Sequence, residues 1–146
     1  MDECPICAKH RGEGPLRGTE IWRDDIVAVT HLPAREGPVV LGYLFVEPLR
    51  HAPYLDDLTD VEASAVGSAA RRAAIGLRAE LDAEHIFSAV IGRGVPHFHQ
   101  HVFPRYRGTP DETPWYASTG WTEAPRGGEP EIAALVARLR GYFTAV

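Results

Sequence analysis

The sequence lacks several features that would assign it to a class at once. It has no apolar run near the roughly 18 residues that a membrane-spanning helix needs, and its first ten residues, MDECPICAKH, lack the apolar stretch of a secretory signal peptide. We therefore expect a cytoplasmic protein. It also lacks excess positive charge, because 15 Lys and Arg stand against 20 Asp and Glu, a net charge of -5. No basic field is available for a long nucleic acid, although a single nucleotide held by local contacts remains compatible.

The composition that is present is typical of one soluble globular domain. The chain has 146 residues, of which 45% are apolar and 24% are charged. We see neither an internal repeat nor a second domain, so we expect a single domain over residues 1–146. The unusual feature is histidine: there are 7, and three of them, His97, His99 and His101, fall within a short segment. We expect function to centre there.

Cysteine is scarce, and the only two, Cys4 and Cys7, form a CxxC motif. Without a secretory signal, such a motif indicates a metal site or a redox pair more often than a structural disulfide. A thioredoxin-type motif lies between a strand and a helix, whereas this one precedes any strand signal, so metal binding is favoured. His10 would complete a local Cys-x2-Cys-x2-His set, but histidines elsewhere could serve instead. Two free thiols at a frayed N-terminus are the third alternative.

Five segments rich in β-branched and aromatic residues predict strands, the first two joined as a hairpin around Asp24 and Asp25. They cover residues 20–23, 26–30, 39–46, 85–91 and 97–103. Thr59 and Glu62 have the spacing of a capping box, so a long helix should run from there to about Asp82. Its apolar stripe consists of Val66, Ala70, Ala73, Leu77 and Leu81.

The C-terminal third begins with residues 105–130, which carry Gly, Pro, Thr and Asp without periodicity and predict a long loop. The aromatic side chains of this loop could cover a site or simply wrap the surface; they are Trp115, Tyr116 and Trp121. Pro130 suits the first turn of a final helix. The apolar stripe of that helix consists of Ile132, Leu135, Val136, Leu139 and Tyr142.

The three clustered histidines alternate with Phe98 and Gln100. In a strand this spacing places all three imidazoles on one face, where they could bind a metal together or at least one could act as a nucleophile or acid–base group. The loop before them, residues 92–95, offers backbone amides that could hold phosphate oxygens beside His99. Its residues are Gly92, Arg93, Gly94 and Val95. Together these features suggest attack of a neutral imidazole on phosphorus, which needs no separate base near pH 7.

The residues from His97 to Phe103, HFHQHVF, resemble the signature of the histidine triad family, with Gln100 in a usually apolar position. Residues 45–51, FVEPLRH, look like the strand of that family that ends in a Pro-x-Arg-His segment. The CxxC motif, this segment, the long helix and the triad follow in the order of the zinc-containing branch. The resemblance covers about residues 1–107 and implies an α+β fold: a five-stranded antiparallel sheet, one long helix after the third strand, and a C-terminal helix. It also implies a homodimer.

The resemblance further implies a nucleotide hydrolase or transferase. His99 would attack the α-phosphorus of a nucleoside 5′-phosphoryl substrate, and water would hydrolyse the nucleotidyl-histidine to a nucleoside monophosphate. His101 would hydrogen-bond the phosphoryl or leaving-group oxygen. One structural zinc per chain would be held by Cys4, Cys7, His51 and His97, which makes residues 1–18 a zinc-binding N-terminal segment and leaves residues 105–146 as a variable loop and helix.

Other details depart from the family pattern. Many members have an Asp that binds ribose where this chain has His31, which becomes the candidate substrate contact there. Arg93 could hold a second phosphate, or it could form only a surface ion pair. We assign His10 and His85 to solvent or to spare metal contacts. A dinucleoside polyphosphate and a nucleoside phosphoramidate both fit as substrates. The alternatives are a purine-nucleotide-binding protein with little turnover and a nucleotidyltransferase or phosphorylase.

Overall fold

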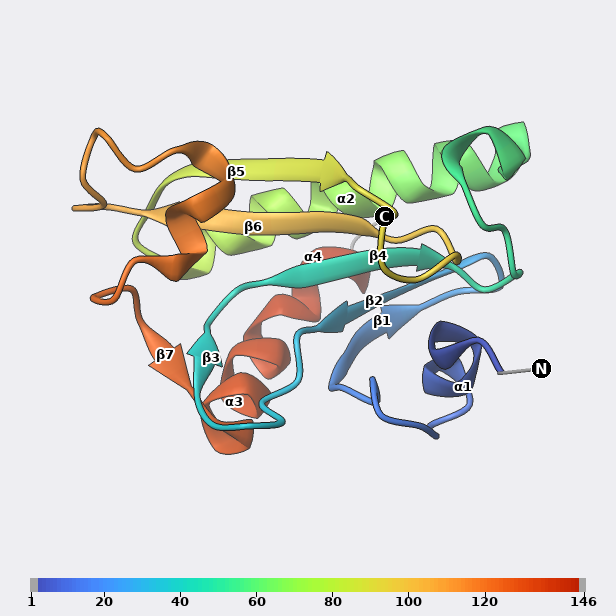
Figure 1. Ribbon diagram of the computed structural model, residues 1–146, viewed down its shortest axis with the longest axis horizontal. Coiled ribbons are helices and arrows are strands. Elements are labelled where there is room, and N and C mark those ends of the chain that lie inside the picture. Colours follow the sequence, from blue (N-terminus) through green and yellow to red (C-terminus); the bar gives the residue numbers. More distant parts are fainter. Residues whose placement is uncertain (1–2, 145–146) are drawn as a thin grey trace.

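The computed structural model describes residues 3–144. Its centre is a five-stranded antiparallel sheet, which confirms the α+β fold expected from the sequence (Figure 1). In spatial order the strands are β1 (Glu20–Arg23), β2 (Val27–His31), β4 (Leu44–Pro48), β6 (Gln100–Tyr106) and β5 (Ala83–Val90). Within the described residues, no helix is both long and apolar enough to cross a membrane.

Three helices pack together behind the sheet in Figure 1. They are α2 (Asp60–Glu80), which follows the third strand of the sheet, α3 (Glu129–Leu139) and α4 (Gly141–Thr144). The capping box of α2 is confirmed, because the Thr59 hydroxyl accepts from the Glu62 N–H and the Glu62 carboxylate accepts from the Thr59 N–H. Most of the two predicted stripes is buried in the main core: Val66, Ala70, Ala73 and Leu77 from α2, and Ile132, Leu135, Val136 and Leu139 from α3. The other two predicted residues, Leu81 and Tyr142, are partly buried against this core, and Tyr142 belongs to α4.

The two faces of β4 divide the molecule into a structural side and a functional side. Successive strand side chains point to opposite faces, and Leu44 and Val46 lie in the helix-covered core. Phe45 and Glu47 point the other way, into a cavity bordered by α1 (Pro5–His10). The candidate site therefore lies on the face that α2, α3 and α4 leave free.

The predicted strand over residues 39–46 is wrong in one respect, because it is broken in the middle. Residues Val39–Val40 form β3, which pairs with β7 (Arg126–Gly127) in a separate two-stranded sheet. Gly42 then takes a positive φ of 96°, and a Cβ there would lie 2.6 Å from Leu81 Cδ1. Only glycine fits this bend, so β4 starts at Leu44.

Two further boundaries differ from the prediction. The strand expected over residues 97–103 begins only at Gln100, because the N–H of Phe98 bonds to the carbonyl of Ala52 across the loop instead of joining the sheet ladder. The region 105–130 is not one long loop: its first two residues belong to β6, and it contains the 3₁₀ helix η2 (Trp115–Gly120) and β7. A second 3₁₀ helix, η1, covers Leu55–Asp57. The final helix is also interrupted at Arg140, between α3 and α4.

Candidate metal centre and histidine site

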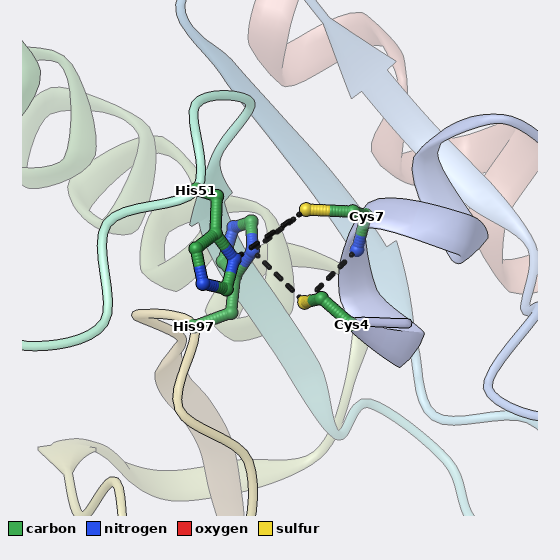
Figure 2. A group of neighbouring side chains, drawn as sticks. All are labelled: Cys4, Cys7, His51 and His97. Atoms are coloured by element: carbon green, nitrogen blue, oxygen red, sulfur yellow. Dashed lines mark hydrogen bonds between the residues drawn. The ribbon is translucent and has the colours of Figure 1, made fainter. Parts of the chain in front are cut away.

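Four side chains from three distant segments converge beside α1 (Figure 2). Cys4, Cys7, His51 and His97 each offer a ligand atom, and these atoms all lie within 4.8 Å of one another. Cys4 is the N-cap of α1, and its sulfur accepts from the Cys7 N–H at 3.4 Å, so one helical turn brings both sulfurs to the same side. His51 follows β4 and His97 precedes β6.

The distances in this cluster fit a tetrahedral metal site. Bond lengths of about 2.3 Å to sulfur and about 2.05 Å to nitrogen give sulfur–nitrogen separations of about 3.6 Å around zinc. Here His97 Nδ1 lies 3.4 Å from each sulfur, and His51 Nδ1 lies 3.6 Å from the Cys7 sulfur. His97 Nε2 donates to the Pro48 carbonyl at 2.8 Å, which leaves Nδ1 with its lone pair toward the sulfurs.

The charge state of the cysteines also points to a cation. Burial and the neighbouring Cys4 sulfur raise the pKa of Cys7 to about 11, so without a cation its thiol stays protonated at neutral pH. Both cysteines can be thiolates here only when a cation between them offsets their charge. A Cys2His2 set is typical of structural zinc sites, in which four protein ligands leave no open position. The free cysteines form no disulfide.

His51 is held in place by the residue before it. Arg50 donates two hydrogen bonds to the Glu62 carboxylate, at 2.7 and 3.0 Å, and a third to the Asp57 carbonyl at 2.8 Å. The Arg50 hydrogen bond is the main reason that the pKa of Glu62 falls to about 2. The capping residue of α2 therefore also anchors the segment that presents His51.

His10 and His85 lie outside the cluster. His10 Nε2 is 3.0 Å from a Glu47 oxygen, and its ring packs edge-on against His97. The structure thus brings His51 and not His10 to the two cysteines, and the local Cys-x2-Cys-x2-His alternative is not formed. His10 is not solvent-exposed as expected, whereas exposed His85 packs on the Phe87 ring.

The next histidine of the row, His99, is oriented by the backbone of His97. His99 Nδ1 is 2.7 Å from the His97 carbonyl oxygen, which can only accept, so Nδ1 carries the proton. In the neutral imidazole, Nε2 then has a free lone pair. His99 lines a cavity of about 290 Å³, so a small molecule bound in that cavity would contact this side chain.

His101 is fixed in the complementary state by Tyr43, a residue that the sequence did not identify. The Tyr43 hydroxyl is 2.8 Å from His101 Nδ1. We assign the hydroxyl as the donor, because it has no other acceptor among the described residues. Burial, reinforced by His99, lowers the pKa of His101 to about 4. The neutral ring therefore carries its proton on Nε2, a buried atom with no protein partner. His101 lines the same cavity as His99 and can donate one hydrogen bond to a ligand.

The cavity itself has an apolar wall and a few polar groups. Its apolar side chains include Ile6, Leu16, Leu32 and Phe45. Besides the two histidines, the polar groups are Lys9, Arg35 and Glu47. Lys9 and Glu47 form a buried ion pair at 2.7 Å that sequence reasoning missed. The one available signal was a carboxylate placed inside the apolar segment that ends at Pro48.

The loop before the triad is only partly at the site. Val95 lines the 290 Å³ cavity, and Gly92, with φ of 70°, lines a second cavity of about 430 Å³ on which His99 also borders. Arg93 and Gly94 are exposed and line neither cavity. Within residues 3–144, the Arg93 side chain has no ion pair, so the surface ion pair considered from sequence is not formed. Trp115 stacks on Phe103 and does not cover the cavity.

His31 does not present a group to the cavity. It is buried, with Nδ1 donating to the Leu32 carbonyl at 2.7 Å and Nε2 accepting from the Gly42 N–H at 2.9 Å. Burial lowers its pKa, which keeps the ring neutral and both nitrogens engaged. No ring nitrogen remains for a ribose hydroxyl, and its neighbours Leu32 and Pro33 line the cavity instead.

Comparison with known proteins identifies the fold. No protein-family model matches the sequence, and no curated protein matches it. Solved structures do match over nearly the whole chain. A zinc-bound histidine triad family protein from Mycobacterium smegmatis has a TM-score of 0.70 at 21% identity, covering 96% of this chain and 92% of that one.

Two other structures give the same result. A hypothetical histidine triad nucleotide-binding protein from Sulfolobus tokodaii has a TM-score of 0.72 at 19% identity, covering 95% of this chain and 91% of its own. A Hit-like protein involved in cell-cycle regulation from Bartonella henselae has a TM-score of 0.69 at 21% identity, with 97% and 98% covered. At such low identity these likenesses establish the histidine triad fold.

Proposed function

We propose that this chain, which has the histidine triad fold, is a nucleotide hydrolase that cleaves a nucleoside 5′-phosphoryl bond through a nucleotidyl-His99 intermediate. The substrate is a dinucleoside polyphosphate or a nucleoside phosphoramidate. The observation that carries the proposal is the orientation of His99. Its Nδ1 is committed to the His97 carbonyl, and its ring borders a cavity large enough for a nucleoside.

In the first step, the His99 Nε2 lone pair attacks the α-phosphorus. A phosphorus–nitrogen bond forms while the bond to the leaving group breaks. His101 donates its Nε2 proton in a hydrogen bond to the phosphoryl or leaving-group oxygen, in agreement with its unpartnered, buried Nε2. In the second step, water attacks the same phosphorus, the nucleoside monophosphate leaves, and His99 regains its lone pair.

The loop over residues 92–95 assists by binding phosphate. Gly92 and Val95 line the two cavities on which His99 borders, so in this proposal their amides bind the reacting phosphoryl group. Gly94 lies between them, and exposed Arg93 is free to contact a second phosphate that extends toward solvent. His31 has no role in this proposal because both of its ring nitrogens are bonded within the protein.

The metal in this proposal is one structural zinc per chain, bound by Cys4, Cys7, His51 and His97. When bound, it supplies a crosslink between α1, the end of β4 and the segment before β6. The protein's own residues carry the chemistry. His97 links the metal site to the catalytic histidine, since its ring faces the cysteines while its carbonyl orients His99.

We also place the protein in the cytoplasm as a single-domain homodimer. Support for self-association comes from β5, which is an edge strand of the sheet and pairs only with β6 among the described strands. The exposed side of α2 carries Val61 and Ile75, which are 63% and 43% exposed. An open strand edge and exposed apolar side chains are both features that a second copy can cover.

Rapid quench with a substrate labelled at the α-phosphate tests the reaction. The wild-type protein is expected to trap label covalently, and His99→Ala is expected to lose both the trapped label and turnover. His85→Ala is a matched control, because His85 is exposed and lies away from the cavity. Normal turnover by His99→Ala would contradict the proposal.

Two alternative functions can be distinguished from the hydrolase with the same purified protein. A nucleotide-binding protein with little turnover is favoured by the engaged state of His31, because both of its ring nitrogens are bonded within the protein and neither can bind a ribose hydroxyl. Calorimetry with AMP would then show binding without product. A nucleotidyltransferase or phosphorylase is favoured by the second cavity at His99, which could admit an acceptor. Added phosphate would then yield a nucleoside diphosphate.

A further inference from the structure

We infer that Lys9 is a specificity residue whose ammonium group binds a keto oxygen on the nucleobase. The preferred substrates would then carry an oxo base, such as guanine, hypoxanthine or uracil, rather than an amino base, such as adenine or cytosine. This inference rests on the proposed function, because it takes the 290 Å³ cavity beside His99 to hold the nucleoside.

Lys9 has one hydrogen-bond donor without a protein partner. Its Nζ donates to Glu47 Oε2 at 2.7 Å and to the Thr30 hydroxyl at 3.2 Å, which uses two of three N–H groups. Nζ also lies 5.3 Å from the centre of the Phe45 ring, and no further acceptor occurs within residues 3–144. The side chain is only 7% exposed and lines the cavity. A buried donor without an acceptor is costly, so a ligand that supplies one gains affinity.

The charges around Lys9 favour a neutral acceptor over a phosphate. Glu47 is 1% exposed, and its second oxygen is bonded to His10. Although burial acts in the opposite direction, the contacts with His10 and Lys9 lower the pKa of Glu47, so it is negatively charged at neutral pH. This carboxylate offsets the ammonium charge and would repel a phosphate beside it. A carbonyl oxygen accepts a hydrogen bond without bringing a full charge.

The rest of the cavity suits the flat ring that would carry such an oxygen. Ile6, Leu16, Leu32 and Phe45 form an apolar wall, whereas the histidines lie where the phosphoryl group would be. An amino group at the same ring position would direct its own N–H groups toward the ammonium. Both Glu47 oxygens already accept a hydrogen bond, so an amino base would gain less from this site.

Calorimetry on the metal-loaded wild-type protein tests the inference with two pairs of nucleotides. In each pair, one base carries an oxo group where the other carries an amino group. IMP and AMP differ at the N1–C6 edge of the purine, and UMP and CMP differ at the corresponding pyrimidine edge. A hydrogen bond from a charged donor predicts about 10- to 100-fold tighter binding of IMP than AMP, and of UMP than CMP. Lys9→Met is expected to abolish both preferences while it leaves the affinity for AMP nearly unchanged.

Two further variants distinguish the loss of the Lys9 hydrogen bond from a general loss of folding. Lys9→Met leaves the buried Glu47 carboxylate with His10 alone, so Lys9→Met/Glu47→Gln removes both charges together. Arg35→Met is the matched control, because Arg35 is an exposed cation at the same cavity and should not affect the preference. Circular dichroism and metal content establish that each variant is folded.

The outcomes distinguish this inference from the proposed function. If the wild-type protein binds IMP and AMP equally while His99 is still labelled by substrate, the Lys9 inference is overturned and the hydrolase proposal stands. A preference that persists in the folded double variant also overturns it. If none of the four nucleotides binds and no label is trapped, the proposed function itself fails.

Discussion

The His97 carbonyl oxygen accepts a 2.7 Å hydrogen bond from His99 Nδ1 while the His97 ring faces the sulfurs of Cys4 and Cys7. One residue therefore joins the candidate metal centre to the candidate nucleophile. Because the segment 97–99 is outside the regular strand β6, its conformation depends on such local contacts. Loss of the metal should therefore disturb His99 as well as the N-terminus.

This relationship gives a prediction about metal ligands. The wild-type protein should contain about one zinc per chain, and Cys4→Ser/Cys7→Ser and His51→Ala should each lose it. Both variants should unfold at a lower temperature and lose activity, since the segment that orients His99 is no longer held. Elemental analysis, thermal denaturation and turnover measure the three effects.

His10→Gln is the matched control for the metal ligands. His10 is the histidine nearest to the two cysteines in sequence, but it is bonded to Glu47 and lies outside the cluster. The His10→Gln variant should therefore retain zinc. Retention of zinc by His51→Ala together with loss by His10→Gln would reverse the assignment.

A second prediction concerns Tyr43, whose hydroxyl fixes the proton of His101 on Nε2. Tyr43→Phe should release this constraint and lower kcat by about 10- to 100-fold, because the neutral ring can then adopt either tautomer. KM should change little, since Tyr43 does not line the cavity. Nitrogen NMR of His101 should show a shift from one tautomer to a mixture.

Tyr106→Phe is a suitable control for Tyr43→Phe. Tyr106 also lies buried, and its hydroxyl donates to the Leu41 carbonyl at 2.6 Å without touching a histidine. It should lose some stability but keep kcat and the His101 tautomer. An unchanged kcat in Tyr43→Phe would remove Tyr43 from the mechanism.

Features of this fold that depend on residues close together in the sequence could be predicted, whereas features that depend on distant residues could not. The capping box of Thr59 and Glu62 and the stripe of α2 depend on neighbours three or four residues apart, so the pattern predicted them correctly. The break in the strand at Gly42 could not be predicted. It depends on the hydrogen bond from the Gly42 N–H to His31 and on the close approach of Leu81 from a distant segment. The strand pattern of residues 39–46 alone contains no such information.

The residues of the candidate site follow the same division between local and distant interactions. The motifs that carry His97, His99 and His101 are local, so the sequence showed them directly. Tyr43 and Lys9 were missed, because their hydrogen bonds to His101 and to Glu47 join residues that are 58 and 38 positions apart. His31 was taken as a substrate contact because its position in the sequence was suggestive, whereas its hydrogen bonds place it in the interior.

A third prediction concerns pH and Glu62, which binds Arg50. Glu62→Gln should destabilise the protein at pH 7 by about 1–2 kcal/mol, because the capping residue of α2 loses its charge-assisted bonds. The folded-state pKa of Glu62, about 2, is below its ordinary value of 4.5. Its stabilisation is therefore fully present above pH 4.5 and is lost as the pH falls toward 2. Urea unfolding of both proteins should show their difference shrink over this range. A difference that stays constant down to pH 2 would exclude this role.

A fourth prediction concerns the acid sensitivity caused by His101. The pKa of His101 in the folded protein is about 4, whereas the ordinary value is 6.5. Between these two values the unfolded chain binds a proton that the folded protein does not, so the free energy of unfolding should decrease as the pH falls from 6.5 to 4. His31, whose pKa is also lowered by burial, acts in the same direction, so His101→Asn should make this slope shallower without abolishing it. Urea unfolding of the metal-loaded protein at several pH values between 4 and 7 measures the slope. An equally steep slope in His101→Asn would mean that His101 is already protonated in the folded state. His101 could then not act as the neutral hydrogen-bond donor whose tautomer Tyr43 selects.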